Sequence, residues 1–226
     1  MTKLVIKLDD LLEFEPITAN QKKAWDSWYK DNDNIALVGS AGTGKTFIGL
    51  YFALEAALQK NTPFHQVILV RSVVPTREIG FLPGSISEKV DVYQAPYKNI
   101  CDELFHEEKA YQNLINAHVL DFETTSYIRG KTFDNAIILV DEMQNLNFHE
   151  LDSVITRMGK NSRIIFCGDY LQSDFTNEGE REGVNKFLNV MDHMKNFNTV
   201  RFTWDDIVRS DFVRDYIMTK EMLNIR

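Results

Sequence analysis

The sequence lacks any long hydrophobic run. Its longest uninterrupted apolar stretches, such as AIILV at residues 136–140, are far too short to cross a bilayer. The beginning, MTKLVIKLDDLLEFEP, has acids inside its apolar run and no small-residue cleavage site, so we expect no signal peptide. Only two cysteines occur, Cys101 and Cys167, and their separation matches no metal-binding spacing. These features predict a cytoplasmic protein with reduced, partly buried thiols and no membrane partner.

Positive charge is also scarce, because 25 lysines and arginines face 33 aspartates and glutamates, which gives a net charge of −8. This balance argues against broad, charge-driven binding to nucleic acid, although it leaves room for a local basic site. The sequence has no proline-, glycine- or serine-rich linker, no internal repeat and no low-complexity tract. With 226 residues, 44% of them hydrophobic, we expect one domain with a packed core.

Short apolar runs separated by helical patterns indicate the fold class. Buried strands of a parallel sheet have this character, because helices cover both faces of such a sheet. The clearest helical pattern runs from Lys45 to about Gln59 and has an apolar face. Strands alternating with helices predict an α/β fold with a doubly wound, mainly parallel sheet. The expected strands are residues 34–39, 66–70, 136–141 and 163–168, with 199–203 and the region near Val119 as further candidates.

A glycine-rich stretch follows the first expected strand. Residues 39–46 read GSAGTGKT and match the phosphate-loop pattern G-x-x-x-x-G-K-[ST] in full. Glycine lets such a loop turn tightly and aim its N–H groups inward, and the next helix points its positive end at the same place. A plain strand–turn–helix corner is the alternative, but the flanking strand and helix favour ATP binding. The expected nucleotide-binding residues are Gly39, Ser40, Ala41, Gly42, Thr43, Gly44, Lys45 and Thr46.

Side chains in this loop and after a later strand predict hydrolysis. Lys45 can reach the β- and γ-phosphates, and the Thr46 hydroxyl can bind Mg²⁺. Asp141 ends an apolar strand and is a second expected ligand of Mg²⁺, directly or through water. Glu142 beside it can orient or deprotonate the attacking water as the catalytic base. The pair could instead begin a solvated turn, but the phosphate loop upstream favours catalysis, and the second acid favours an ATPase over a small-molecule kinase.

Gln172 and Gln21 each have a structural and a functional interpretation. Gly168, Asp169 and Gln172 follow another apolar strand, and the spacing G-D-x-x-Q resembles the third motif of superfamily 1 helicases. Gln172 could sense the γ-phosphate or position water, or Asp169 could cap a simple turn. Gln21 lies in Thr18-Ala-Asn-Gln21, which predicts a capping box. Its amide could also read the adenine edge, as in the Q motif of helicase-type ATPases, and the two roles are compatible.

Longer segments carry a family resemblance. They are RSVVPTREIGFLPGSISEKVDVYQAPYKNICDEL at residues 71–104, then SYIRGKTFDNAIILVDEMQN, GDYLQSDF and FTWDDIVRSDFV. In their order and spacing the sequence resembles the PhoH-like ATPases, which are phosphate-loop enzymes close to helicase motor domains. The most specific part is GFLPG followed by EKVD and a Pro-Tyr pair. The resemblance implies one PhoH-like domain over residues 1–226, with a core of about 16–213 and a RecA-like fold.

The resemblance also implies ATP hydrolysis, a homo-oligomeric ring such as a hexamer, and action on RNA in some members. Arg71 ends the second expected strand, and Arg129 lies in the segment from Tyr127 to Lys131; both match family positions and are candidate contacts for single-stranded RNA or DNA. Alternatively, Arg71 could pair with an acid and Arg129 could belong to a solvated turn. Arg209 matches the family's late arginine, a candidate arginine finger from its own or a neighbouring chain. A helical i,i+4 charge pair within DDIVR is the other interpretation.

The sequence therefore predicts a Mg²⁺-dependent ATPase that acts like a helicase or translocase on single-stranded RNA or DNA. One RecA-like domain lacks the second half of a superfamily 1 helicase, so we expect an oligomer to complete the ATP site. A chain of this size resembles phage-encoded members, which would place it in the host cytoplasm. The alternatives are an ATP-dependent protein-interaction module with little hydrolysis, which the net charge of −8 favours, and a small-molecule kinase with an acceptor pocket formed by Pro75 to Tyr97.

Overall fold

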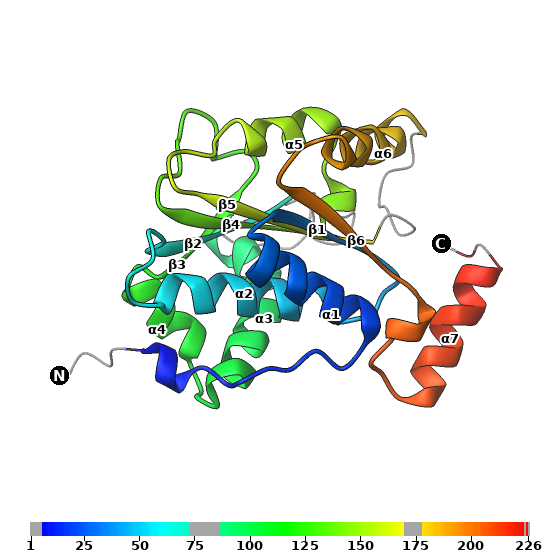
Figure 1. The fold of residues 1–226 in the computed structure, drawn as a ribbon, viewed down its shortest axis with the longest axis horizontal. Coiled ribbons are helices and arrows are strands. Elements are labelled where there is room, and N and C mark those ends of the chain that lie inside the picture. Colours follow the sequence, from blue (N-terminus) through cyan, green and yellow to red (C-terminus); the bar gives the residue numbers. More distant parts are fainter. Residues whose placement is uncertain (1–5, 73–85, 170–177, 224, 226) are drawn as a thin grey trace.

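A central parallel sheet organises the molecule. The computed structural model describes residues 6–72, 86–169, 178–223 and 225. Within these ranges a six-stranded sheet lies between layers of helices, as Figure 1 shows. Neighbouring strands are parallel throughout, and their order is β3-β2-β4-β5-β1-β6. The prediction of a doubly wound parallel sheet is therefore confirmed.

The strands are apolar because both faces of the sheet are covered. In β4, Ile137 and Leu139 belong to one hydrophobic core, whereas Ile138 and Val140 belong to the core on the opposite face. This explains why the strands appear in the sequence as continuous apolar runs without polar alternation. All of the expected strands are present, and their bounds are β1 (Asn34–Gly39), β2 (Gln66–Arg71), β3 (Leu120–Thr124), β4 (Ala136–Asp141), β5 (Arg163–Gly168) and β6 (Phe197–Phe202).

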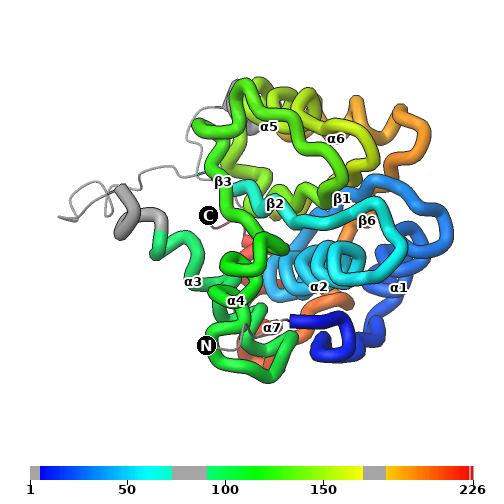
Figure 2. Tube along the Cα trace, turned by 90° about the vertical axis from the view of Figure 1, so that its left-hand side faces the viewer, coloured from blue at the N-terminus to red at the C-terminus, as the bar shows by residue number. Residues whose placement is uncertain are grey.

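Helices form a layer on each side of the sheet, and Figures 1 and 2 agree on their placement. One side carries α1 (Ala19–Asp26), α2 (Lys45–Leu58), α3 (Ile86–Phe105) and α4 (Ala110–Asn116). The other side carries α5 (Phe148–Ile155) and α6 (Glu178–Asp192). The last helix, α7 (Asp211–Met222), lies beyond the carboxyl end of β6. Short helical turns cover Leu8–Asp10, Ser27–Asp31, Met143–Asn145 and Trp204–Asp206.

Helix α2 begins at Lys45 and ends at Leu58, close to the predicted bounds. It is buried on more than one face, because the sheet covers one side and aromatic residues cover another. The ring of Trp28 stacks on that of Phe52 with centroids 5.7 Å apart. Burial around α2 fixes the direction of its first turn, which starts at the phosphate loop.

The carboxyl ends of the strands meet at one edge of the sheet, because all six strands are parallel. β5 lies between β1 and β4 in the sheet. The loops that follow β1, β4 and β5 are therefore neighbours in space, although they are distant in the sequence. Ligand sites of such sheets lie at this edge, and the predicted catalytic residues that the structure describes, Lys45, Glu142 and Arg209, gather there.

The thiols of Cys101 and Cys167 are free and wholly buried, which is deeper than the partial burial expected from the sequence. Both belong to the hydrophobic core on the α2 side of the sheet. Among the described residues, no helix combines the length and the apolar character that a membrane span requires.

Candidate active site

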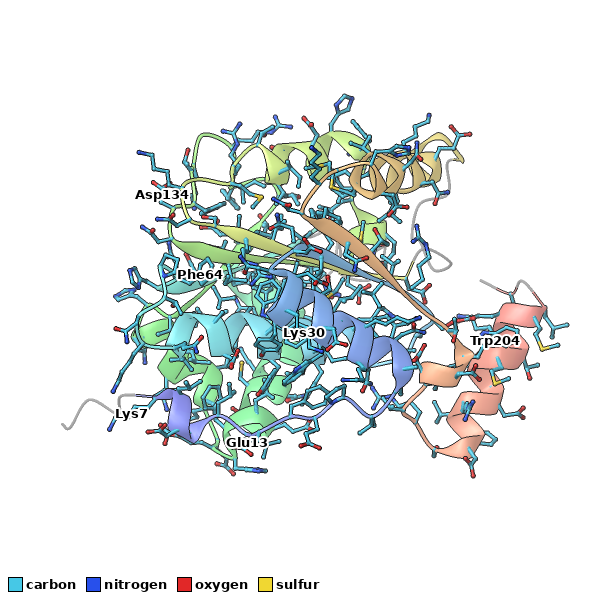
Figure 3. All side chains as sticks on the ribbon, viewed as in Figure 1. Lys7, Glu13, Lys30, Phe64, Asp134 and Trp204 are labelled. Carbon is cyan, nitrogen blue, oxygen red and sulfur yellow. The ribbon has the colours of Figure 1, made fainter. Side chains whose placement is uncertain are left out.

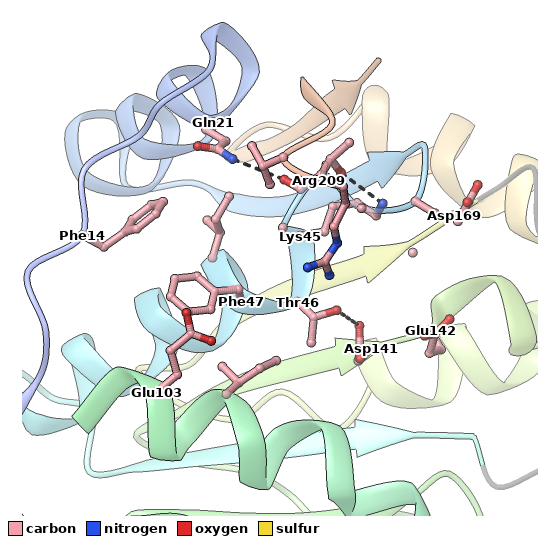
Figure 4. A pocket seen from close by; sticks show the side chains of 18 of the residues that line it. Phe14, Gln21, Lys45, Thr46, Phe47, Glu103, Asp141, Glu142, Asp169 and Arg209 are labelled. Atoms are coloured by element: carbon pink, nitrogen blue, oxygen red, sulfur yellow. Dashed lines mark hydrogen bonds between the residues drawn. The ribbon is translucent and has the colours of Figure 1, made fainter. Parts of the chain in front are cut away.

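A cavity of about 630 Å³ opens beside the loop between β1 and α2 (Figure 4). Its walls bring together segments from the beginning, the middle and the end of the chain. Of the predicted site residues, it is lined by Gln21, Ala41, Gly42, Thr43, Gly44, Lys45, Thr46, Asp141, Glu142 and Arg209. Gln172 lies outside the described residues, as do residues 73–85 of the segment that a kinase acceptor pocket would need.

The loop depends on glycine for its shape. Gly39 has a φ of +132°, and a Cβ atom there would lie 2.0 Å from the carbonyl oxygen of Phe202 in β6. Gly44 precedes α2 with a φ of +83°, in the left-handed region that side chains disfavour. The sequence pattern thus corresponds to a backbone that other residues would strain.

Lys45 is held inside the loop. Its Nζ donates hydrogen bonds to the carbonyl oxygens of Gly39 at 2.8 Å and Ser40 at 2.6 Å. Burial lowers the pKa of the ammonium group, while the nearby carboxylate of Asp169, among others, acts in the opposite direction. The ammonium group therefore lies where the loop can present it to a bound phosphate.

Ser40 belongs to the same loop but contacts the C-terminal helix. Its hydroxyl donates a hydrogen bond of 3.0 Å to Oε2 of Glu221 in α7. The indole Nε1 of Trp204 donates to the same carboxylate oxygen. One side of the phosphate loop is thus attached to α7 by a single carboxylate.

Asp141 lies across from the first turn of α2, and both of its carboxylate oxygens accept hydrogen bonds. Thr46 Oγ1 donates to Oδ1 at 2.9 Å, and the hydroxyl of Tyr97 in α3 donates to Oδ2 at 2.8 Å. A carboxylate beside a hydroxyl, at the end of a phosphate loop, is a donor set that suits Mg²⁺. Tyr97 was missed by sequence reasoning, although it is the Tyr of the Pro-Tyr pair.

Glu142 follows with a left-handed backbone, at a φ of 53°. Burial raises the pKa of its carboxyl group, and the neighbouring charge of Asp141 adds to this rise. Gln144 donates its side-chain amide to Glu142 and accepts a 2.9 Å hydrogen bond from the backbone N–H of Asp169. Gln144, also missed from the sequence, joins the loop after β4 to the loop after β5, and its place in DEMQN was the available signal.

Gln21 connects α1 to the phosphate loop. Its backbone N–H donates to the Thr18 hydroxyl at 3.3 Å, as the predicted capping box requires. The reciprocal bond differs, because Gln21 Oε1 accepts from the backbone N–H of Ile17 at 2.9 Å. Its Nε2 donates to the carbonyl oxygen of Thr43 at 3.3 Å. Each amide atom can still form one more hydrogen bond, so adenine recognition stays a prediction.

Arg71 and Arg129 do not line this cavity. The guanidinium of Arg71 donates to the hydroxyl of Tyr97 at 3.4 Å and to the carbonyl of Tyr93 at 3.5 Å. Within the described ranges it forms no ion pair, so the alternative of an acidic partner is not observed. Arg129 is exposed in the turn after β3, next to Gly130, and it lines a separate cavity of about 260 Å³.

Arg209 points into the main cavity beside Gly42 (Figure 4). It follows the helical turn Trp204–Asp206 and does not lie on a longer helix. Asp205 forms its ion pair with Arg214 and not with Arg209, at 3.8 Å between Asp205 Oδ1 and the Arg214 guanidinium. The i,i+4 pair considered for DDIVR is therefore wrong, since the chain does not stay helical long enough to form it.

The chain is similar in sequence to proteins described as PhoH-like. The family model described as PhoH-like protein matches residues 13–220. A PhoH-like protein of Mycobacterium leprae is 31% identical over 218 residues, which cover 94% of this chain and 61% of that protein. Protein PhoH of Escherichia coli K12 is 33% identical over 178 residues, with 78% and 49% covered. The chain thus spans about half to three-fifths of the length of these curated relatives.

Solved structures share the fold at low sequence identity. The large terminase of a thermophilic bacteriophage, in complex with ADP, has a TM-score of 0.53 and 14% identity over 92% of this chain and 50% of that one. Another crystal form of the same terminase has a TM-score of 0.51 and 18% identity over 92% and 50%. At this identity the likeness shows the fold alone, and it confirms the predicted phosphate-loop NTPase fold.

Proposed function

Because the chain belongs to the PhoH-like protein family, we propose that it is a Mg²⁺-dependent ATPase. The observation that carries the proposal is the meeting of the phosphate loop, Asp141 and Glu142 in one cavity. A nucleotide-binding motif alone would support binding, whereas the carboxylate of Glu142 beside that of Asp141 supports hydrolysis.

ATP would lie along the cavity with its phosphates in the loop. The backbone N–H groups of residues 39–46 and the ammonium of Lys45 supply positive charge there. The opposite part of the cavity holds the rings of Phe14 and Phe47, with centroids 5.6 Å apart, and the side chain of Glu103 lies beside Phe47. This part would receive the adenine ring of ATP, with Gln21 at its edge (Figure 4).

Thr46 and Asp141 would hold Mg²⁺, directly or through water. Mg²⁺ prefers hard oxygen ligands and usually takes only one or two from the protein. The described residues contain no cluster of three or more His, Cys, Asp or Glu side chains that could enclose a metal. When bound, the ion would neutralise charge on the β- and γ-phosphates.

Glu142 would act as the base. Its carboxylate accepts a proton from the water that attacks the γ-phosphorus, the Pγ–O bond to ADP breaks, and phosphate leaves. Gln144 would keep the carboxylate oriented through the hydrogen bond already present. Arg209 would place positive charge near the transferred phosphoryl group, and Gln172 would sense the γ-phosphate.

The work coupled to hydrolysis is proposed to be action on single-stranded RNA or DNA by a homo-oligomeric ring, such as a hexamer, in the cytoplasm. Arg71 and Arg129 are the candidate polymer contacts. Arg71 ends β2, and Arg129 follows β3, which pairs with β2 in parallel. Both residues therefore belong to the carboxyl edge that also carries the ATP site, which supports coupling between them.

The test is steady-state ATP hydrolysis with Mg²⁺, alone and with single-stranded RNA or DNA. Stimulation by one polymer is expected, together with a loss of turnover and retained ATP binding in Glu142→Gln. Lys45→Ala should lose tight binding, and Lys186→Ala, an exposed lysine in α6, is the matched control. Normal hydrolysis by Glu142→Gln would refute the role of the base. A monomer at micromolar concentration with ATP bound would refute the ring.

The net charge of −8 favours one other function, an ATP-dependent protein-interaction module with little hydrolysis. Such a module would bind ATP through the same cavity and change its affinity for a protein. A rate of ATP hydrolysis that neither RNA nor DNA changes, together with a protein partner bound only in the presence of ATP, would support this function over the first.

A further inference from the structure

The hydroxyl group of Tyr97 lies between a cation and the carboxylate of Asp141. It receives a hydrogen bond from Arg71 at 3.4 Å and donates one to Asp141 at 2.8 Å. Tyr97 is fully buried, with 0% of its surface exposed, and Asp141 is only 4% exposed. The surrounding residues therefore shield the Tyr97 hydroxyl from solvent.

The direction of the hydrogen bonds is fixed by chemistry. A tyrosine hydroxyl has one proton to donate, and an ionised carboxylate only accepts. Arg71 therefore donates to Tyr97, Tyr97 donates to Oδ2 of Asp141, and Thr46 donates to Oδ1 from the other side. The carboxylate is clamped between α2 and α3, and its plane is set by both donors.

The aromatic ring alone does not require a tyrosine at this position. It packs in the core beside Phe122 with centroids 6.1 Å apart, a role that phenylalanine would fill. Burying the hydroxyl is unfavourable unless it forms hydrogen bonds, and here its partners, Arg71 and Asp141, lie at the carboxyl edge of the sheet. The hydroxyl is therefore best explained by its hydrogen bond to the Asp141 carboxylate.

We propose that Tyr97 is a positioning residue that orients the Asp141 carboxylate for Mg²⁺. The inference rests on the proposed ATPase function and adds a residue to its machinery. Removing a partner that orients a metal ligand commonly lowers the metal affinity by about tenfold or more. Tyr97 should therefore affect the response to Mg²⁺ and leave the binding of metal-free ATP nearly unchanged.

Tyr97→Phe removes only the hydroxyl and keeps the ring. Tyr111→Phe is a matched control, because Tyr111 in α4 is also buried and its hydroxyl has no hydrogen-bond partner among the described residues. Equilibrium binding of a fluorescent ATP analogue would be measured for both variants and wild type. Each titration would be made in EDTA and again at increasing Mg²⁺ concentrations, with thermal unfolding as the check on folding.

For Tyr97→Phe we expect analogue affinity in EDTA within about twofold of wild type, and a Mg²⁺ midpoint raised by about tenfold. Tyr111→Phe should match wild type in both. An unchanged Mg²⁺ midpoint in Tyr97→Phe, or an equal shift in both variants, would overturn the inference while the ATPase proposal stands. Absence of ATP binding to wild type would instead overturn the proposed function, and this inference with it. If Tyr97→Phe does not fold, Tyr97→His, which is smaller than tyrosine and keeps a ring N–H donor, must recover a Mg²⁺ response closer to wild type than Tyr97→Leu; equal responses would overturn the inference.

Discussion

Thr46 donates a hydrogen bond of 2.9 Å to Asp141, although 95 residues separate them in the sequence. The bond spans from the first turn of α2 to the end of β4, past the intervening strand β5. It brings the phosphate loop within reach of the two acids at the end of β4, Asp141 and Glu142. The candidate active site is therefore assembled by the strand order, and single substitutions can test its parts.

The stability contributed by Glu142 should depend on pH. Its folded-state pKa is raised above the ordinary value of 4.5, chiefly by burial. At pH values between the pKa of Glu142 in the unfolded state and its pKa in the folded state, the folded protein binds more protons than the unfolded chain. Stability therefore falls as pH rises through the folded-state pKa. Glu142→Gln removes this effect. Without nucleotide and in EDTA, it should unfold at a higher temperature than wild type at about pH 8, and the difference should disappear below pH 4.5.

Thermal unfolding followed by circular dichroism would measure this difference, and Glu182→Gln, an exposed carboxylate paired with Lys186, is the control. A difference that is constant across pH would contradict the raised pKa of Glu142.

Gly39→Ala should destabilise the fold strongly. The new methyl group would meet the carbonyl oxygen of Phe202, and the backbone has a φ of +132°. The expected loss is about 3 kcal/mol in the free energy of unfolding, measured in urea. Gly130→Ala is the matched control, since Gly130 also has a positive φ, +82°, but nothing lies within 4 Å of its Cβ position. Its loss should be about 1 kcal/mol, and equal losses would refute the steric explanation.

Arg209 should act on the ATP site of its own chain. Its side chain already lines the cavity beside Gly42, with no neighbouring chain required. Arg209→Ala should bind ATP but hydrolyse it slowly, because charge near the transition state is lost. Mixing Arg209→Ala with Glu142→Gln should restore no activity, because each chain would still lack one catalytic group. Recovered hydrolysis in the mixture would show that Arg209 acts between chains.

The strands and the phosphate loop were predictable because their signals are local. A run such as residues 136–141 is apolar without interruption only when both faces of a strand are buried, and the glycines of residues 39–46 are adjacent in the sequence. The place of Asp141 and Glu142 at the same edge of the sheet as the loop followed from the parallel arrangement of the strands.

Other parts of the site depend on contacts that no local pattern encodes. Tyr97 reaches Asp141 only because α3 packs against the sheet with one particular rotation, and the sequence does not give that rotation. Gln144 joins two loops whose proximity requires the strand order. The i,i+4 pairing considered for Arg209 failed because the chain leaves its helical turn at Asp206.

The attachment of the phosphate loop to α7 offers an optical consequence. Trp204, labelled in Figure 3 beside α7, shares the Glu221 carboxylate with Ser40 of the loop. The other tryptophans, Trp25 and Trp28, lie in an aromatic cluster around Phe52. A chain with both replaced by phenylalanine would emit from Trp204 alone. Its fluorescence would then follow the loop as nucleotide enters or leaves, in real time and without an added label.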